Sequence, residues 1–183
     1  MNSLVRLRRS RAKRTRGAEV LEFTLVFAPM MAMVLVLLDI GWVIFAKATL
    51  QYAVRTGVRA GVTITGTQAT AAGSDLTAMV KSIVQQRSLG LLHGASGLSK
   101  IKVHYFQPPA AGSTGPAVDV SNQPNGNTPL YIMQVSVEGY SLAPFVARLY
   151  SFKDVDTSPT TITAIAADLI EPSRDVPPIG VAP

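Results

Sequence analysis

The sequence contains no cysteine, one tryptophan and two histidines among its 183 residues. Without cysteine there is no disulfide framework and no thiol chemistry, so an exported domain would have to fold on its hydrophobic core alone. His93 and His104 have no acid at ligand spacing nearby, and no HExxH, GxSxG, P-loop or CxxC motif occurs. Asp154 and Asp156 lack the glycine-bearing oxygen loop of a calcium site. We therefore predict no enzyme activity, cofactor, metal site or small-molecule substrate.

Acidic residues are absent from the first 18 positions, where basic residues are concentrated. Seven of the 17 Lys and Arg lie within residues 1–16. The other ten, together with all eleven acids, lie in residues 17–183, which therefore carry a net charge of about −1. Such a basic run can bind nucleic acid or an anionic surface. This one adjoins an apolar stretch and has no interleaved aromatic residues, which favours a cytoplasmic topology anchor over nucleic-acid binding.

Lys and Arg are absent from residues 23–46, "FTLVFAPMMAMVLVLLDIGWVIFA", and Asp39 is the single charge among these 24 residues. About 20 apolar residues cross a bilayer as a helix, so the run predicts a membrane span, too long for an ordinary signal peptide. The preceding positive charges predict a cytoplasmic N-terminus and an exported C-terminal part. Pro29 removes a backbone hydrogen bond and is expected to kink the helix.

The helix is expected to continue beyond the membrane, over residues 18–65. In "KATLQYAVRTGVRAG" (47–61), Lys47, Gln51, Arg55 and Arg59 recur every four residues, and small or apolar residues lie largely opposite them. The small residues permit close approach of another helix. The alternative is a simple anchor followed by a separate amphipathic helix.

The remaining sequence indicates an α+β domain over residues 66–172, with a linker at 66–74 and a loose tail at 173–183. A helix is expected from residue 76 to near Gly90, and strands at 98–106, 131–140 and 160–172. Proline, glycine and asparagine predict a long loop at 107–128, and residues 142–150 suit a short helix or a hydrophobic connection. The simplest packing is one helix on a small antiparallel sheet.

One stretch resembles a known family. "RGAEVLEF" (16–23) before an apolar helix is similar to the processing site of class III prepilins, a glycine, four residues, then glutamate and an aromatic residue. Together with "LLDIGWVIFAKATLQYAVRTGVRAG", it resembles the TadE-like family, minor pilins or pseudopilins of the Tad/Flp type IVb pilus. The resemblance covers about 45 residues. A type II secretion pseudopilin fits less well, because those usually carry phenylalanine after the cleaved glycine.

The resemblance implies that a prepilin peptidase removes the basic leader, residues 1–17, by cutting between Gly17 and Ala18. It implies that Glu22 neutralises the new amine, with Phe23 beside it in the recognition motif. Taken alone, Glu22 also fits the general preference for acidic residues near a helix N-terminus, where the helix dipole favours negative charge. Glu19 has no evident role. Asp39 either pairs with a neighbouring helix or reaches interfacial water.

The expected protein is a single-pass inner-membrane protein that assists pilus assembly by packing its long helix against other pilins. The expected partners are the peptidase, those pilins and the assembly platform, and incorporation into the pilus is one possible fate. An unprocessed, signal-anchored envelope protein with an exported interaction domain is the alternative.

Overall fold

The computed structural model describes residues 11–124, 126–143, 159–172 and 175–180. The chain divides into two compact units, of which the first includes residues up to Trp42. The second contains residues 43–142 and 159–183 and is called the head below. The described residues form an α+β fold, in which the order of elements is α1 (Arg11–Thr63), α2 (Gly66–Ala71), α3 (Leu76–Arg87), α4 (Gly94–Leu98), β1 (Ile101–Gln107), β2 (Val118–Asp119), β3 (Ile132–Leu142) and β4 (Thr160–Leu169).

Helix α1 runs without a break for 53 residues, so the amphipathic segment 47–61 belongs to the same helix as the apolar run. The helix also begins earlier than the expected residue 18. It ends where β-branched residues accumulate, at Thr63 and Ile64. The next residues form α2 rather than the expected linker, because Thr65 and Gln68 make a capping box with side-chain bonds in both directions.

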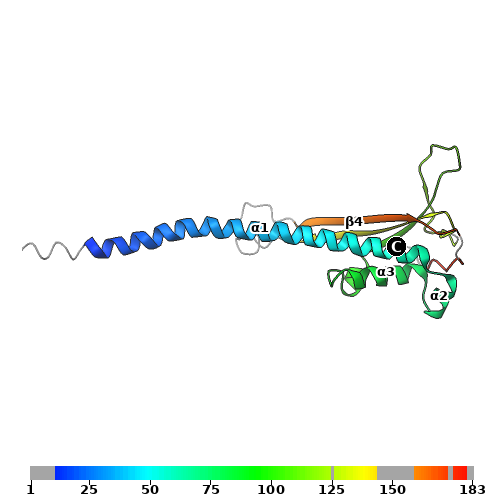
Figure 1. The fold of residues 1–183 in the computed structure, drawn as a ribbon, viewed down its shortest axis with the longest axis horizontal. Helices are drawn as coiled ribbons and strands as arrows, with labels where there is room; N and C mark the ends of the chain where they lie inside the picture. The colour runs from blue at the N-terminus through cyan, green and yellow to red at the C-terminus, as the bar shows by residue number, and fades with distance from the viewer. Residues whose placement is uncertain (1–10, 125, 144–158, 173–174, 181–183) are drawn as a thin grey trace, which may run out of the picture. The chain divides into compact units, whose positions relative to one another are not determined.

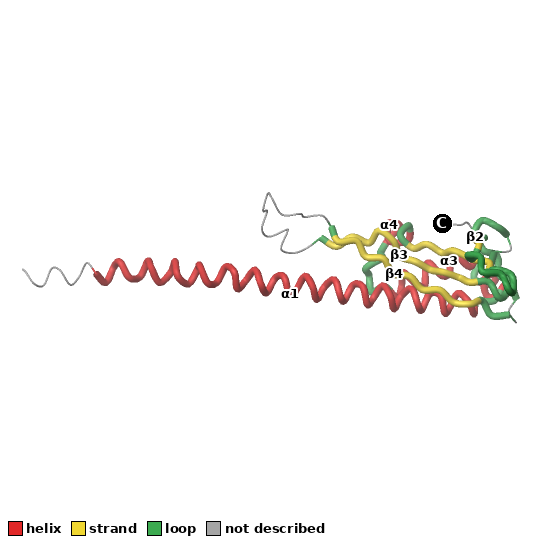
Figure 2. The backbone as a smooth tube through the Cα atoms, turned by 90° about the horizontal axis from the view of Figure 1, so that it is seen from above, coloured by secondary structure: helices red, strands yellow, loops and turns green. Residues whose placement is uncertain are grey.

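The head contains a four-stranded antiparallel sheet in the order β2-β1-β3-β4, seen edge-on in Figure 1 and from above in Figure 2. In the central pair Ile101 lies opposite Val137 and Phe106 opposite Ile132. A register shift between Val137 and Tyr140 accommodates Gly139 at φ +66° in β3. The three longer strands occur where the sequence predicts strands, whereas β2 lies within the predicted loop 107–128 and α4 in a segment with no predicted element.

The core lies on one face of the sheet, which α3 and the head part of α1 cover together (Figure 1). Alternate residues of β1 and β3 point into it, which is the period-two pattern expected of half-buried strands. Two helices therefore cover the sheet, rather than one. The largest completely or almost completely buried side chains are Tyr105, Leu50, Leu76, Leu92, Ile101, Met133 and Ile170.

The segment 175–180 is bound to the head, in contrast to the loose tail expected at 173–183. Its carbonyl groups accept hydrogen bonds from the first amides of two helices, Gly66 of α2 and Leu76 and Thr77 of α3. Ile179 is buried in the core, 5% exposed. These amides have no partner within their own helices, so the segment supplies acceptors that the helix ends need.

Three predictions fall on residues outside the described ranges. They concern the N-terminal half of the basic leader, most of the segment 142–150, and Asp154 with Asp156.

Candidate functional site

The exposed apolar part of α1 is the candidate site. Large apolar side chains are exposed from Val20 to Phe45; Phe23, for example, is 67% exposed. Among the described residues, α1 alone is long and apolar enough to cross a membrane, by length and composition. A helix this apolar and this exposed fits a single-pass membrane anchor.

The residues of the predicted processing site all lie within α1. Gly17, Ala18, Glu19 and Glu22 are exposed, and a side chain at Gly17 would meet no atom within 4 Å. Phe23 stacks on Phe27 with 5.4 Å between ring centroids. The motif is therefore accessible, and its glycine occupies a helical position with open space around it.

Pro29 and Asp39 lie further along the same helix. Pro29 cannot donate a backbone hydrogen bond, but α1 is helical on both sides of it, and the expected kink stays a prediction. Asp39 is half-buried within the apolar run.

The juncture after the apolar run has two faces. One row, containing Leu50, Ala53, Gly57 and Gly61, is buried in the head, whereas Arg55 and Arg59 are exposed. The glycines face other elements of the head rather than open space.

A Cβ added at Gly57 would collide with Val84 of α3, and one added at Gly61 would lie 2.6 Å from Met133 Sδ and 2.8 Å from Val80 Cγ2. The small residues do permit close packing, as predicted. The partners observed are α3 and β3 of the same chain.

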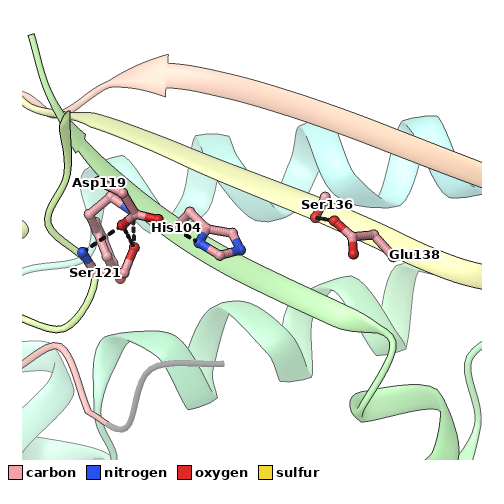
Figure 3. Close-up of polar contacts among 6 residues, drawn as sticks. His104, Asp119, Ser121, Ser136 and Glu138 are labelled. Carbon is pink, nitrogen blue, oxygen red and sulfur yellow. Dashed lines mark hydrogen bonds and ion pairs between the residues drawn. The ribbon is translucent and has the colours of Figure 1, made fainter. Parts of the chain in front are cut away.

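A polar cluster on the sheet face opposite the core was not anticipated from the sequence, in which His104 has no acid nearby. The strand pair β1–β2 brings His104 Nδ1 to 3.3 Å from Asp119 Oδ2 (Figure 3). Asp119 Oδ1 also accepts hydrogen bonds from the Ser121 amide at 2.9 Å and hydroxyl at 2.5 Å. These bonds from Ser121, and then the neighbouring imidazole, lower the pKa of Asp119.

The cluster has the residue types of a hydrolytic triad but a different geometry. The Ser121 hydroxyl donates to the carboxylate and accepts from the Tyr105 amide at 2.9 Å. A nucleophilic serine would instead donate to the histidine. The contacts His104–Asp119 and Tyr105–Ser121 instead stabilise the pairing of β2 with β1. In the same view Ser136 donates to Glu138 at 3.0 Å (Figure 3).

Comparison with known proteins finds a similarity in the N-terminal helix. The family model described as TadE-like protein matches residues 17–59. No curated protein and no solved structure matches the chain. The match confirms the resemblance predicted from the sequence, and it begins at the glycine of the processing motif and ends at Arg59, in the exposed row of the juncture. The chain is therefore similar to the TadE-like family over residues 17–59, the N-terminal helix and its juncture with the head.

Proposed function

We propose that this protein is a minor pilin or pseudopilin that assists assembly of a Tad/Flp type IVb pilus. The observation that carries the proposal is the TadE-like match, which coincides with an exposed apolar helix. In this function the helix crosses the inner membrane and then packs against other pilin helices. The head contacts partner proteins, either pilins or the assembly platform, and no step requires catalysis by this chain.

The orientation follows from the leader. Seven positive charges precede the apolar run, so the N-terminus stays in the cytoplasm and the head is exported. A prepilin peptidase then cuts after Gly17 and removes those charges. Glycine weakens a helix by about 1 kcal/mol relative to alanine, and this eases the local unwinding that a protease needs. The open space around Gly17 supports this role.

Glu22 acts after cleavage. The Ala18 amine becomes a cation at the membrane boundary, one helical turn from Glu22 along α1. A charge without a partner in hydrocarbon costs several kcal/mol. Glu22 of one subunit therefore pairs with the amine of a neighbouring subunit, and this requirement fixes the axial register of the assembly.

Processing is tested by N-terminal sequencing and by the variant Gly17→Arg, in cells that have the peptidase. We expect the mature wild-type protein to begin at Ala18 and the variant to give a heavier band on an immunoblot. Gly41→Ala, at the other exposed glycine of α1 with open space around it, should be processed normally. A wild-type protein that retains its leader would support the signal-anchored alternative. One observation favours that alternative: the Gly17–Ala18 bond lies inside a continuous helix, which a protease would have to unwind.

The role of Glu22 is tested by crosslinking to other pilins and by counting pili. Glu19→Ala is a matched control, because Glu19 is an equally exposed acid in the same part of α1. We expect Glu22→Ala to lose crosslinks and pili, and Glu19→Ala to keep them. Equal behaviour of the two variants would leave Glu22 only the interaction with the helix dipole, about 0.3–1 kcal/mol.

A further inference from the structure

The connection between α3 and α4 is held firmly by hydrogen bonds. Ser88 is completely buried; its hydroxyl donates to Gln85 O at 2.7 Å and accepts from the Leu92 amide at 3.1 Å. The Gln85 side chain donates to Gly94 O at 3.0 Å. Leu92 is anchored in the core. The connection therefore has a defined shape, and the residues at its surface are presented in a fixed position.

Leu89, within this connection, has an unfavourable conformation and an exposed side chain. It follows the C-cap Ser88 with φ +51°, a region that glycine normally occupies after a helix. Its side chain is 74% exposed. A leucine in this conformation costs about 1 kcal/mol or more relative to glycine. Because the side chain is exposed, burial in the core does not offset this cost, and the side chain is a candidate for contact with another surface.

The position of Leu89 is defined by the packing of α3 on α1. Gly57 faces Val84, and the later Gly61 faces the earlier Val80, so the two helices run antiparallel. Leu89 is five residues beyond Val84, which places it level with Tyr52 of α1. At 1.5 Å per residue, Tyr52 lies about 9 Å beyond Ala46, the last residue of the apolar run. The polar layer of a bilayer extends about 5–8 Å beyond the hydrocarbon, so a leucine side chain directed toward the membrane reaches it.

The exposed side chains of residues 45–55 of α1, together with Arg87 of α3, have the composition of a membrane interface. Phe45 and Tyr52 are aromatic and exposed, Tyr52 by 58%. Lys47, Arg55 and Arg87 are exposed cations. Aromatic residues are enriched at headgroup depth, and cations there attract anionic lipids.

We propose that the α3–α4 connection is a second membrane contact, in which Leu89 enters the headgroup layer and Arg87 binds anionic phospholipid. The contact holds the near end of the head against the bilayer that α1 crosses before assembly. A protein partner with an apolar pocket is the competing occupant. Lipid is favoured because Leu89 and Arg87 lie at the end of the head nearest Ala46, where the apolar run ends, and α1 carries exposed aromatic and basic residues at the same end. This inference rests on the membrane anchoring in the proposed function.

The test uses the full chain in vesicles of phosphatidylcholine with and without phosphatidylglycerol. Because the chain has no cysteine, single-cysteine variants carry one environment-sensitive fluorophore each. The labelled positions are Leu89, Leu130 and Val34. Leu130 is a matched control, since it is 54% exposed with φ +70°. It precedes Met133, which faces Gly61, and so lies at the other end of the head.

We expect blue-shifted emission and protection from an aqueous quencher at Leu89, more strongly with phosphatidylglycerol, and aqueous emission at Leu130. Val34 reports the span itself. If Val34 is in lipid and Leu89 behaves as Leu130 does, the second contact is refuted while the anchor stands. If Val34 is in water, the anchor fails as well.

A second variant separates lipid contact from folding. Leu89→Gly removes the side chain and relieves the backbone conformation, so the thermal midpoint of the head should stay the same or rise. Hydrogen exchange of the amides of residues 89–94 should be slower in anionic than in neutral vesicles for the wild type, and this difference should vanish in Leu89→Gly. An unchanged difference would overturn the role of Leu89.

Discussion

Gly61 offers the sharpest test of how α1 is joined to the head. Any side chain at this position would meet Met133 Sδ at 2.6 Å and Val80 Cγ2 at 2.8 Å from its first carbon. Alanine recovers up to about 1 kcal/mol of helix propensity, which partly offsets the crowding. Valine adds two further carbon atoms and recovers less. Overpacking a filled core costs about 1–3 kcal/mol. We therefore expect Gly61→Val to destabilise the head by about 2–3 kcal/mol, and Gly61→Ala by less.

The measurement is the thermal midpoint of the full chain in detergent, followed by protease resistance of the head. For a domain of this size 1 kcal/mol corresponds to about 3–6 °C, so Gly61→Val should lower the midpoint by about 6–18 °C. Arg59→Ala, on the exposed face of the same helix, should change stability by less than about 0.5 kcal/mol. If Gly61→Val is as stable as Arg59→Ala, the close packing of α1 on Val80 and Met133 does not occur.

Three further predictions concern the head. Ile179→Ala should destabilise the head by about 2–5 kcal/mol in the same assay, because a buried side chain is lost. An effect no larger than that of the exposed substitution Arg59→Ala would contradict binding of the segment 175–180. Asp75→Ala should cost about 1 kcal/mol, since the carboxylate accepts from the Ala78 amide at 2.7 Å as the N-cap of α3, and Asp75→Asn should retain most of the stability. The lowered pKa of Asp119 means that its ionised carboxylate stabilises the folded head above the unfolded carboxyl pKa of about 3.9, and that this stabilisation is lost as the pH falls through the lower folded pKa. The free energy of unfolding should therefore fall less on acidification in Asp119→Asn than in the wild type, as measured by denaturant unfolding at a series of acidic pH values.

The sequence was most informative where one local pattern determined the structure. The apolar run and the four-residue recurrence of Lys47, Gln51, Arg55 and Arg59 were enough to predict one long helix with an exposed basic row. The strands were recognisable because inward and outward residues alternate, and the resemblance to the TadE-like family depends on a nearly contiguous stretch of sequence. These features depend on neighbours in the sequence, which is why they could be inferred without coordinates.

Features that depend on distant residues were not predictable. The pairing of His104 with Asp119 requires the two-residue strand β2 to add to β1 in one register. Ile179 lies in a short segment rich in proline, and its burial is decided by the helices it meets. The helix α2 is a different case, since Thr65 and Gln68 have capping-box spacing, a local signal that was outweighed by the small and polar composition around them.

The binding of residues 175–180 has a consequence for biogenesis. The hydroxyl of Thr77 donates to the carbonyl of Ile179, 102 residues later in the chain. The hydrogen-bond acceptors of the first amides of α2 and α3 are therefore synthesised after every strand of the sheet. Because the chain is synthesised from its N-terminus, α1 is complete while the head is still open at this end. Completion of the head is consequently a late event of chain synthesis, and until then the first turns of α2 and α3 have only their local caps, Thr65 and Asp75.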